Sequence, residues 1–312
     1  MKDLGIDAVS FSNKNPLYHF YADAFEDIGI NYEKQQVGLF DGRPVGEYLS
    51  TIIEDLIDLN MPPDIIRESA LVMDIFMRAQ TYLGKVQGIC NPSRSFSNDP
   101  LDALTNLDHL AALWIGFGQT YGDNENGSML YNLAEKAGAH FGQDQGEVLI
   151  NTQIIALMTQ LQTTLEALLS SSTSLSPSSA TCIDIRRKTS RIQALSYVPL
   201  VQNLIHHMWN GEGNYVELYT LSILPLLRTC DPNSFDSLMN DLVIKSYQTS
   251  RLNSTLMQVQ RLFPCMGILC DDVGEYLYGI IPRCLDNHTA PSTAFWQGYN
   301  ITSDIALKVC LL

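Results

Sequence analysis

The sequence predicts an all-α protein built as a bundle of several helices. Apolar residues recur at helical spacing in many segments, and no segment shows the sustained period-two alternation of a half-buried strand. The clearest stripe lies in 149–169 and consists of Ile150, Ile154, Leu157, Met158, Leu161, Leu165 and Leu168. At ~1.5 Å per residue this helix would span roughly 30 Å. We therefore expect the stretch 107–169 to organise much of the chain around it.

The N-terminal part is predicted to become regular only after an irregular segment, 1–46, with one short helix near 17–27. An amphipathic helix follows over 47–59 and ends at Pro62 and Pro63. A second helix is expected from Asp64 to about residue 83, because an acidic side chain is favourable in a first helical turn. We interpret 84–99 as a loop.

The middle of the chain carries a strong helix-start signal, Asn98-Asp99-Pro100, in which a capping side chain precedes proline. The helix should run to about residue 116, with Asp108 at the edge of its apolar face and so partly desolvated. A shorter helix over 129–140 and the long helix follow. The serine-rich segment 170–179 is interpreted as a flexible linker between two helical halves. A degenerate duplication of these halves is an alternative, although no internal alignment is visible.

The C-terminal part is predicted to hold four more helices, over 186–209, 214–227, 235–247 and 252–263. Pro199 would start or kink the first of them. Periodicity then fades, so we expect a helical domain over 47–275 and a loop-rich, cysteine-containing tail over 276–312.

Composition and motifs exclude several classes of function. The net charge of −15 argues against nucleic acid and against an anionic membrane surface, and it fits a small cation or a basic protein partner better. The alternative, which we favour, is that the acidity only maintains solubility. No stretch approaches the ~20 apolar residues of a transmembrane helix. No P-loop, GxGxxG, HExxH or GxSxG motif occurs. We therefore predict that the protein is not an enzyme.

The cysteines favour an oxidising compartment, outside the cell or at its surface, because they cluster near the C-terminus. Gly267 permits a tight reversal that would bring Cys265 and Cys270 within disulfide range. Pairing of either with Cys230 or Cys284, or seven reduced thiols, remain alternatives. The candidate glycosylation sites are Asn126, Asn253, Asn287 and Asn300.

Three segments together resemble the algal iron-assimilation proteins, the low-iron-induced surface proteins also called phytotransferrins. They are LDHLAALWIGFG…GSMLYNLAEKAGAHFG at 107–142, VPLVQNLIHHMW at 198–209 and FPCMGILCDDVG at 263–274. The resemblance implies an algal, secreted or surface-bound helical domain that binds ferric iron with carbonate. The 14 tyrosines agree with it, since phenolate and carboxylate oxygens suit Fe³⁺. The ligand candidates that it implies are Asp108, Tyr121, Tyr131 and Tyr197.

The sequence also departs from that family. His109 stands where an acid is usual, Trp114 where a tyrosine is usual, and His207 and Trp209 where the second segment has tyrosines. Tryptophan offers no lone pair to a metal, and imidazole is a softer ligand than phenolate. Two hypotheses follow. One is an iron-binding domain, and the other is a structural or interaction subunit of a surface assembly that has lost its metal.

Overall fold

The computed structural model describes residues 45–90, 99–120, 127–170, 176, 179–227 and 232–279, except for Gln145 and Glu147. These residues form helices and connecting segments without any strand, which confirms the all-α prediction. The chain falls into two compact units, Met1–Thr81 and Tyr82–Leu312. The expected short helix near 17–27 and the tail beyond residue 279 lie outside the described residues.

The first unit contains α2 (Val45–Asp58), α3 (Pro63–Ser69), the π-helical turn η3 (Ala70–Ile75) and the start of α4 (Phe76–Gly88). Helix α2 packs against α3 and η3. The break at the two prolines is confirmed, with Pro63 at the first position of α3. The loop expected from residue 84 is wrong, because α4 continues through Gly84. One glycine inside a helix costs only about 1 kcal/mol, too little to end it.

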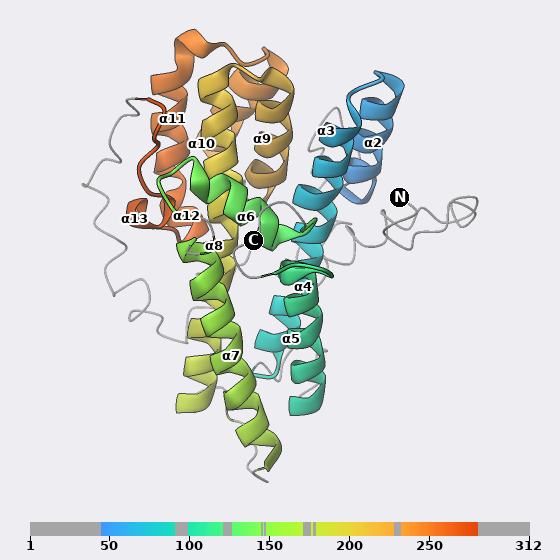
Figure 1. Cartoon of the computed structure of the whole chain (residues 1–312), viewed down its shortest axis with the longest axis vertical. Helices are drawn as coiled ribbons and strands as arrows, with labels where there is room; N and C mark the ends of the chain where they lie inside the picture. Colours follow the sequence, from blue (N-terminus) through green and yellow to red (C-terminus); the bar gives the residue numbers. More distant parts are fainter. Residues whose placement is uncertain are drawn as a thin grey trace. The chain divides into compact units, whose positions relative to one another are not determined.

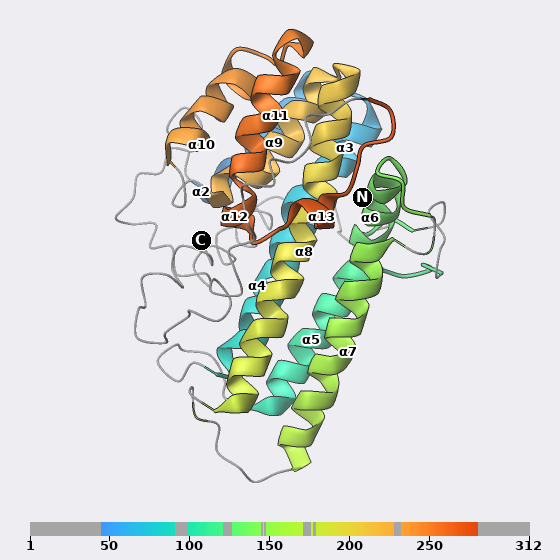
Figure 2. The same ribbon diagram turned by 90° about the vertical axis from the view of Figure 1, so that its left-hand side faces the viewer.

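Three long helices run side by side in the second unit: α5 (Pro100–Ile115), α7 (Leu149–Ser170) and α8 (Ala180–Asn210) (Figures 1 and 2). Helix α7 packs between α5 and α8, and α6 (Leu130–Ala139) contacts all three. The C-terminal helices gather around the second half of α8: α9 (Gly213–Leu227), α10 (Pro232–Met239), η4 (Asn240–Ile244), η5 (Thr249–Arg251) and α11 (Leu252–Arg261). Two short helices, α12 (Phe263–Met266) and α13 (Cys270–Val273), end the described chain.

The longest unbroken run of buried residues lies in α8 rather than in α7, around which we expected the chain to be organised. Every residue from 194 to 205 is buried, including Pro199, which lies inside a continuous helix. The apolar stripe of α7 is confirmed at Ile154 and Leu161, but the opposite side of that helix is exposed. A helix that is buried all round needs partners on every side. Helix α8 therefore links α6 and α7 to α9 and α11.

Helix ends agree with the capping signals in the sequence. The Asp99 side chain accepts a hydrogen bond from the Leu101 amide at 2.9 Å, as expected for an N-cap. Helix α8 begins at Ala180, earlier than predicted, because the Ser179 hydroxyl accepts from the Cys182 amide at 3.2 Å. The serine-rich segment therefore connects α7 and α8, which pack against each other within one unit.

The described helices include none that is both long and apolar enough to span a membrane.

Candidate functional site

The implied iron ligands occupy different environments. Asp108 is exposed on α5, so its expected partial desolvation is wrong: the helical register turns Leu107 and Leu110 toward the core instead. Tyr131 on α6 and Tyr197 on α8 are buried, with 2% and 6% of their surfaces exposed. Tyr121 lies outside the described residues. Within the described part of the chain, no group of three or more histidine, cysteine, aspartate or glutamate residues is arranged to hold a metal ion.

Trp114, which replaces a tyrosine of the resembled family, belongs to a buried hydrogen-bond network. Its indole Nε1 donates to Asn151 Oδ1 at 3.0 Å. The Asn151 amide donates in turn to the Tyr131 carbonyl at 3.0 Å and to Glu135 Oε1 at 2.7 Å. The second carboxylate oxygen of Glu135 accepts from the Gly146 amide at 2.8 Å. The network joins α5, α6 and α7, and it gives Trp114 a structural role.

A second group, the histidine–tyrosine cluster, consists of His140, His206, His207, Tyr276 and Tyr278. The rings of His140, at the end of α6, and His206, on α8, stack with centroids 3.7 Å apart and planes 11° apart. His206 Nδ1 lies 3.0 Å from the Tyr276 hydroxyl. Tyr278 meets His140 edge to face at 5.8 Å. The cluster joins the ends of the first two segments that carry the family resemblance to two tyrosines that directly follow the third.

Burial favours the neutral forms of His140, His206 and Tyr276. It lowers the pKa of His206 from 6.5 to about 4, with a further contribution from repulsion by His140 and His207. The pKa of His140 is lowered by the same burial and by His207. Burial also raises the pKa of Tyr276 from 10.0 to about 12. At neutral pH the stacked imidazoles are therefore uncharged, and Tyr276 is a phenol.

His207 faces a different partner from His206, as expected for adjacent residues about 100° apart on a helix. Its ring stacks on Tyr215 at 4.5 Å and 11°, and Tyr219 lies 5.5 Å away. His207 Nδ1 forms a short hydrogen bond with Glu212, at the turn between α8 and α9. His206 and His207 therefore contact different partners, and they do not bind one metal ion together.

The chain crosses the cluster in a non-helical segment, residues 274–279, which we call the strap. The Leu277 amide donates to the His140 carbonyl at 3.0 Å. Gly279 lies so close to Trp209 that a Cβ there would come within 2.1 Å of the indole. Trp209 also contacts Tyr276, with ring centroids 5.9 Å apart. Both tryptophans that stand in place of family tyrosines are thus used in packing.

Asp272 caps the N-terminus of α13 and so anchors the chain just before the strap. Its Oδ2 accepts from the Leu269 amide at 2.9 Å. The same carboxylate binds Arg191 of α8 through two hydrogen bonds of 2.6 and 2.8 Å. Gln202 Nε2 donates to the Val273 carbonyl at 2.8 Å. These bonds fix α13 on α8.

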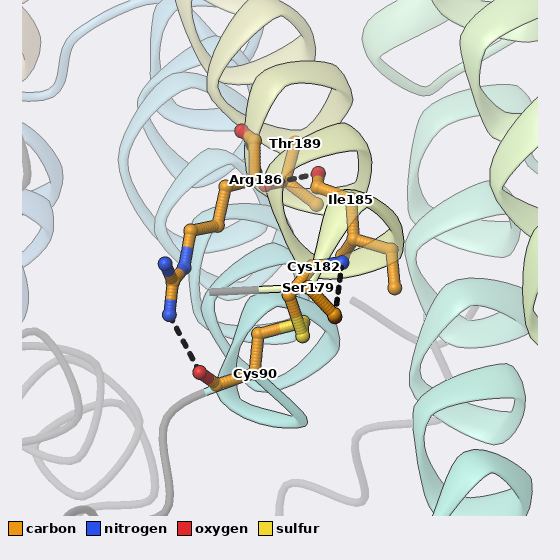
Figure 3. The surroundings of a disulfide bond; sticks show 6 residues. All are labelled: Cys90, Ser179, Cys182, Ile185, Arg186 and Thr189. Atoms are coloured by element: carbon orange, nitrogen blue, oxygen red, sulfur yellow. Dashed lines mark hydrogen bonds between the residues drawn. A yellow bond between two sulfur atoms is a disulfide. The ribbon is translucent and has the colours of Figure 1, made fainter. Parts of the chain in front are cut away.

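A disulfide that sequence reasoning missed joins Cys90 to Cys182 (Figure 3). The two cysteines are 92 residues apart in the chain, and their Cα atoms are 5.4 Å apart. Arg186 supports the bridge by donating to the Cys90 carbonyl at 2.6 Å. No spacing rule pairs cysteines so distant, because only the packing of α8 brings them together.

Two of the four predicted disulfide candidates lie within the described residues. Cys265 and Cys270 both take part in disulfides. Since Cys90 and Cys182 bind each other, partners for Cys265 and Cys270 within the chain must lie among the cysteines from Cys230 onward. Cys230 and Cys284 lie outside the described residues, so the pairing of Cys265 with Cys270 stays a prediction.

The structure describes Gly267 and one of the four candidate glycosylation sites. Gly267 adopts the left-handed conformation, φ +70°, that the expected reversal requires. Of the glycosylation candidates, Asn253 is exposed on the first turn of α11. Asn126, Asn287 and Asn300 lie outside the described residues.

Comparisons with protein-family models, with curated proteins and with solved structures give no match.

Proposed function

We propose that this chain is a non-enzymatic structural or interaction subunit of an extracellular or cell-surface assembly. One observation carries the proposal: the residues that replace tyrosines of the resembled family all serve packing. Trp114 donates a buried hydrogen bond, His207 stacks on Tyr215, and Trp209 packs against the strap. A site rebuilt in this way holds helices together rather than offering oxygen ligands.

The surface next to the histidine–tyrosine cluster supports a role in association. Leu277 and Tyr278 are 59% and 60% exposed, although both are large and mainly apolar. Aromatic and apolar side chains of this kind are common centres of protein interfaces. The odd number of cysteines, seven, also leaves at least one thiol free or bonded to another chain.

Association can be tested by light scattering after size exclusion under oxidising conditions, over a range of concentrations. We expect a concentration-dependent dimer or larger species. Leu277→Ser should weaken it, whereas Leu169→Ser, at a leucine 46% exposed on α7, should not. A lone monomer at high concentration, or equal effects of the two substitutions, would contradict association through the strap.

Binding of ferric iron with carbonate is our second proposal. It is supported by the way the three resembling segments meet, since α6 and α13 both pack on α8. Tyr131 and Tyr197 are buried phenols on two of these helices. Titration with ferric citrate and bicarbonate should then give a visible phenolate-to-iron band.

The iron proposal has a matched control in the tyrosines themselves. Tyr131→Phe and Tyr197→Phe should abolish the band, whereas Tyr278→Phe, at an exposed tyrosine, should leave it unchanged. If the wild-type protein gives no band and retains no iron in the presence of carbonate, the iron proposal fails. The association experiment is unaffected by that result.

A further inference from the structure

We propose that the stacked pair His140–His206 is a proton-operated latch. It holds the strap against α6 and α8 while both imidazoles are neutral, and it releases the strap when the pair takes up protons. The latch itself does not depend on the proposed function. Release of the strap would rearrange the surface around Leu277 and Tyr278. The effect of this rearrangement on a binding partner is the only part that rests on the proposed function.

Hydrogen bonds fix the tautomer of His206. With the Asn210 amide oriented as in the structure, its Nδ2 donates to His206 Nε2 at 3.1 Å, so that Nε2 must be an acceptor. The ring proton then resides on Nδ1 and points to the Tyr276 hydroxyl, 3.0 Å away. A second proton on Nε2 would face an amide donor, so protonation costs the His206–Asn210 contact.

His140 also fits its site only as a neutral ring. Its Nδ1 is buried and has no hydrogen-bond partner in the described part of the chain. An imidazolium donates from both ring nitrogens, and an unsatisfied charged donor is costly. At a centroid distance of 3.7 Å, two charged rings would also repel each other directly. The closed arrangement is thus specific for the neutral pair.

Four other titratable groups surround the pair: His207, Glu212, Tyr276 and Tyr278. His207, on α8, adds repulsion to a charged His140 or His206. Glu212, from the turn after α8, favours a charged His206, but its carboxylate is engaged with His207. Tyr276 of the strap, whose pKa burial raises to about 12, has no charge to offer at acidic pH, and Tyr278 meets the pair only through the edge of its ring. The surroundings therefore oppose protonation of the closed state.

Two tyrosines of the strap contact the stacked rings, Tyr276 at His206 and Tyr278 at His140. The Leu277 amide donates to the main-chain carbonyl of His140, next to the same ring. Separation of the two rings therefore breaks the tyrosine contacts of the strap, and the Leu277 hydrogen bond reports whether the strap then leaves His140.

The sign of the effect follows from the pKa of His206, lowered from 6.5 to about 4. The open state binds protons more tightly than the closed state, so the closed state loses stability as pH falls from about 6.5 toward 4. Above that window the pair is neutral in both states, and the latch is closed.

The test is hydrogen–deuterium exchange of the full oxidised chain between pH 7.5 and 4, corrected for the intrinsic pH dependence of exchange. Helicity at 222 nm is followed in parallel. We expect the Leu277 amide to be protected at neutral pH and to lose protection by about tenfold or more below pH 6, with helicity unchanged. Constant protection down to pH 4, or a loss that coincides with the loss of helicity, would overturn the latch.

Two phenylalanine variants sharpen the test. His140→Phe keeps a flat ring for stacking but cannot titrate, so the strap should stay protected at pH 5. His109→Phe removes another histidine, one that contacts Tyr82 away from the strap, and should keep the wild-type pH dependence. Unaltered pH dependence in His140→Phe would overturn the assignment to this pair. If a variant does not fold, the pH series of hydrogen–deuterium exchange on the wild-type protein still tests the latch.

Discussion

Replacing Asn151 by leucine removes the centre of the buried network and should destabilise the protein strongly. Asn151 is 2% exposed, and its amide is bonded to Trp114, to the Tyr131 carbonyl and to Glu135. Leucine has a similar volume, so the substitution removes hydrogen bonds without opening a large cavity. The effect should therefore come from the polar groups left behind.

The magnitude can be worked out from these groups. The Trp114 indole N–H loses its acceptor in a buried site, which costs about 1–3 kcal/mol. The fully buried Glu135 carboxylate loses a charge-assisted bond worth about 1.5–3 kcal/mol and keeps the one from Gly146. Together we expect a loss of about 3–5 kcal/mol. For a domain of this size that lowers Tm by roughly 10 °C.

The assay is urea unfolding followed by circular dichroism, with thermal unfolding as a second measure. Asn106→Leu is the matched control, because Asn106 makes one exposed bond to the Asp102 carbonyl on α5. It should change stability by no more than about 0.5 kcal/mol. A loss below about 1 kcal/mol for Asn151→Leu would refute the reasoning, because it would mean that water reaches the network or that the helices repack without it.

Three further predictions concern other parts of the fold. Arg191→Met leaves the buried Asp272 charge unpaired and should cost about 2–3 kcal/mol in urea unfolding, whereas Arg251→Met, at an exposed pair, should cost less than about 1 kcal/mol. Burial raises the pKa of Asp74 from 3.8 to about 6, so its contribution to stability is present below pH 3.8 and is lost as pH rises through 6. Asp74→Asn should remove this decline, so the urea midpoint of the variant should fall less than that of the wild type between pH 4.5 and 7.5. An equal fall of the two midpoints over this range would contradict the prediction. Gly267→Ala places a side chain at φ +70° and should cost about 1 kcal/mol by the same assay, and a neutral result would mean that the turn adapts.

The family resemblance and the geometry lead to different expectations at the same positions. The resemblance implies oxygen ligands, whereas the described structure uses Trp114, His207 and Trp209 as packing residues. Iron titration tests for ferric iron binding, and the association experiment tests for assembly of the protein. The two expectations can be distinguished because each experiment has its own control variants. Neither result depends on the proton-operated latch, which concerns His140 and His206.

Much of the fold could be predicted from sequence because helices are specified locally. The apolar stripe of α7, the cap at Asp99 and the reversal at Gly267 each depend on residues within a few positions of one another. The all-α class follows from the same local signals. The error at residue 84 has the same origin, since a glycine lowers helix propensity without excluding a helix when packing favours it.

The tertiary structure alone decided the rest. The bond between Cys90 and Cys182 and the stack of His140 on His206 join residues from distant segments. The apolar neighbours of Asp108 in the sequence predicted that it is partly buried. Its actual exposure depends on how far the adjacent helices extend around α5. Sequence thus determines which side of a helix is apolar, because that depends on periodicity. It does not determine which helix becomes central or which polar side chains meet, because those depend on how whole helices pack.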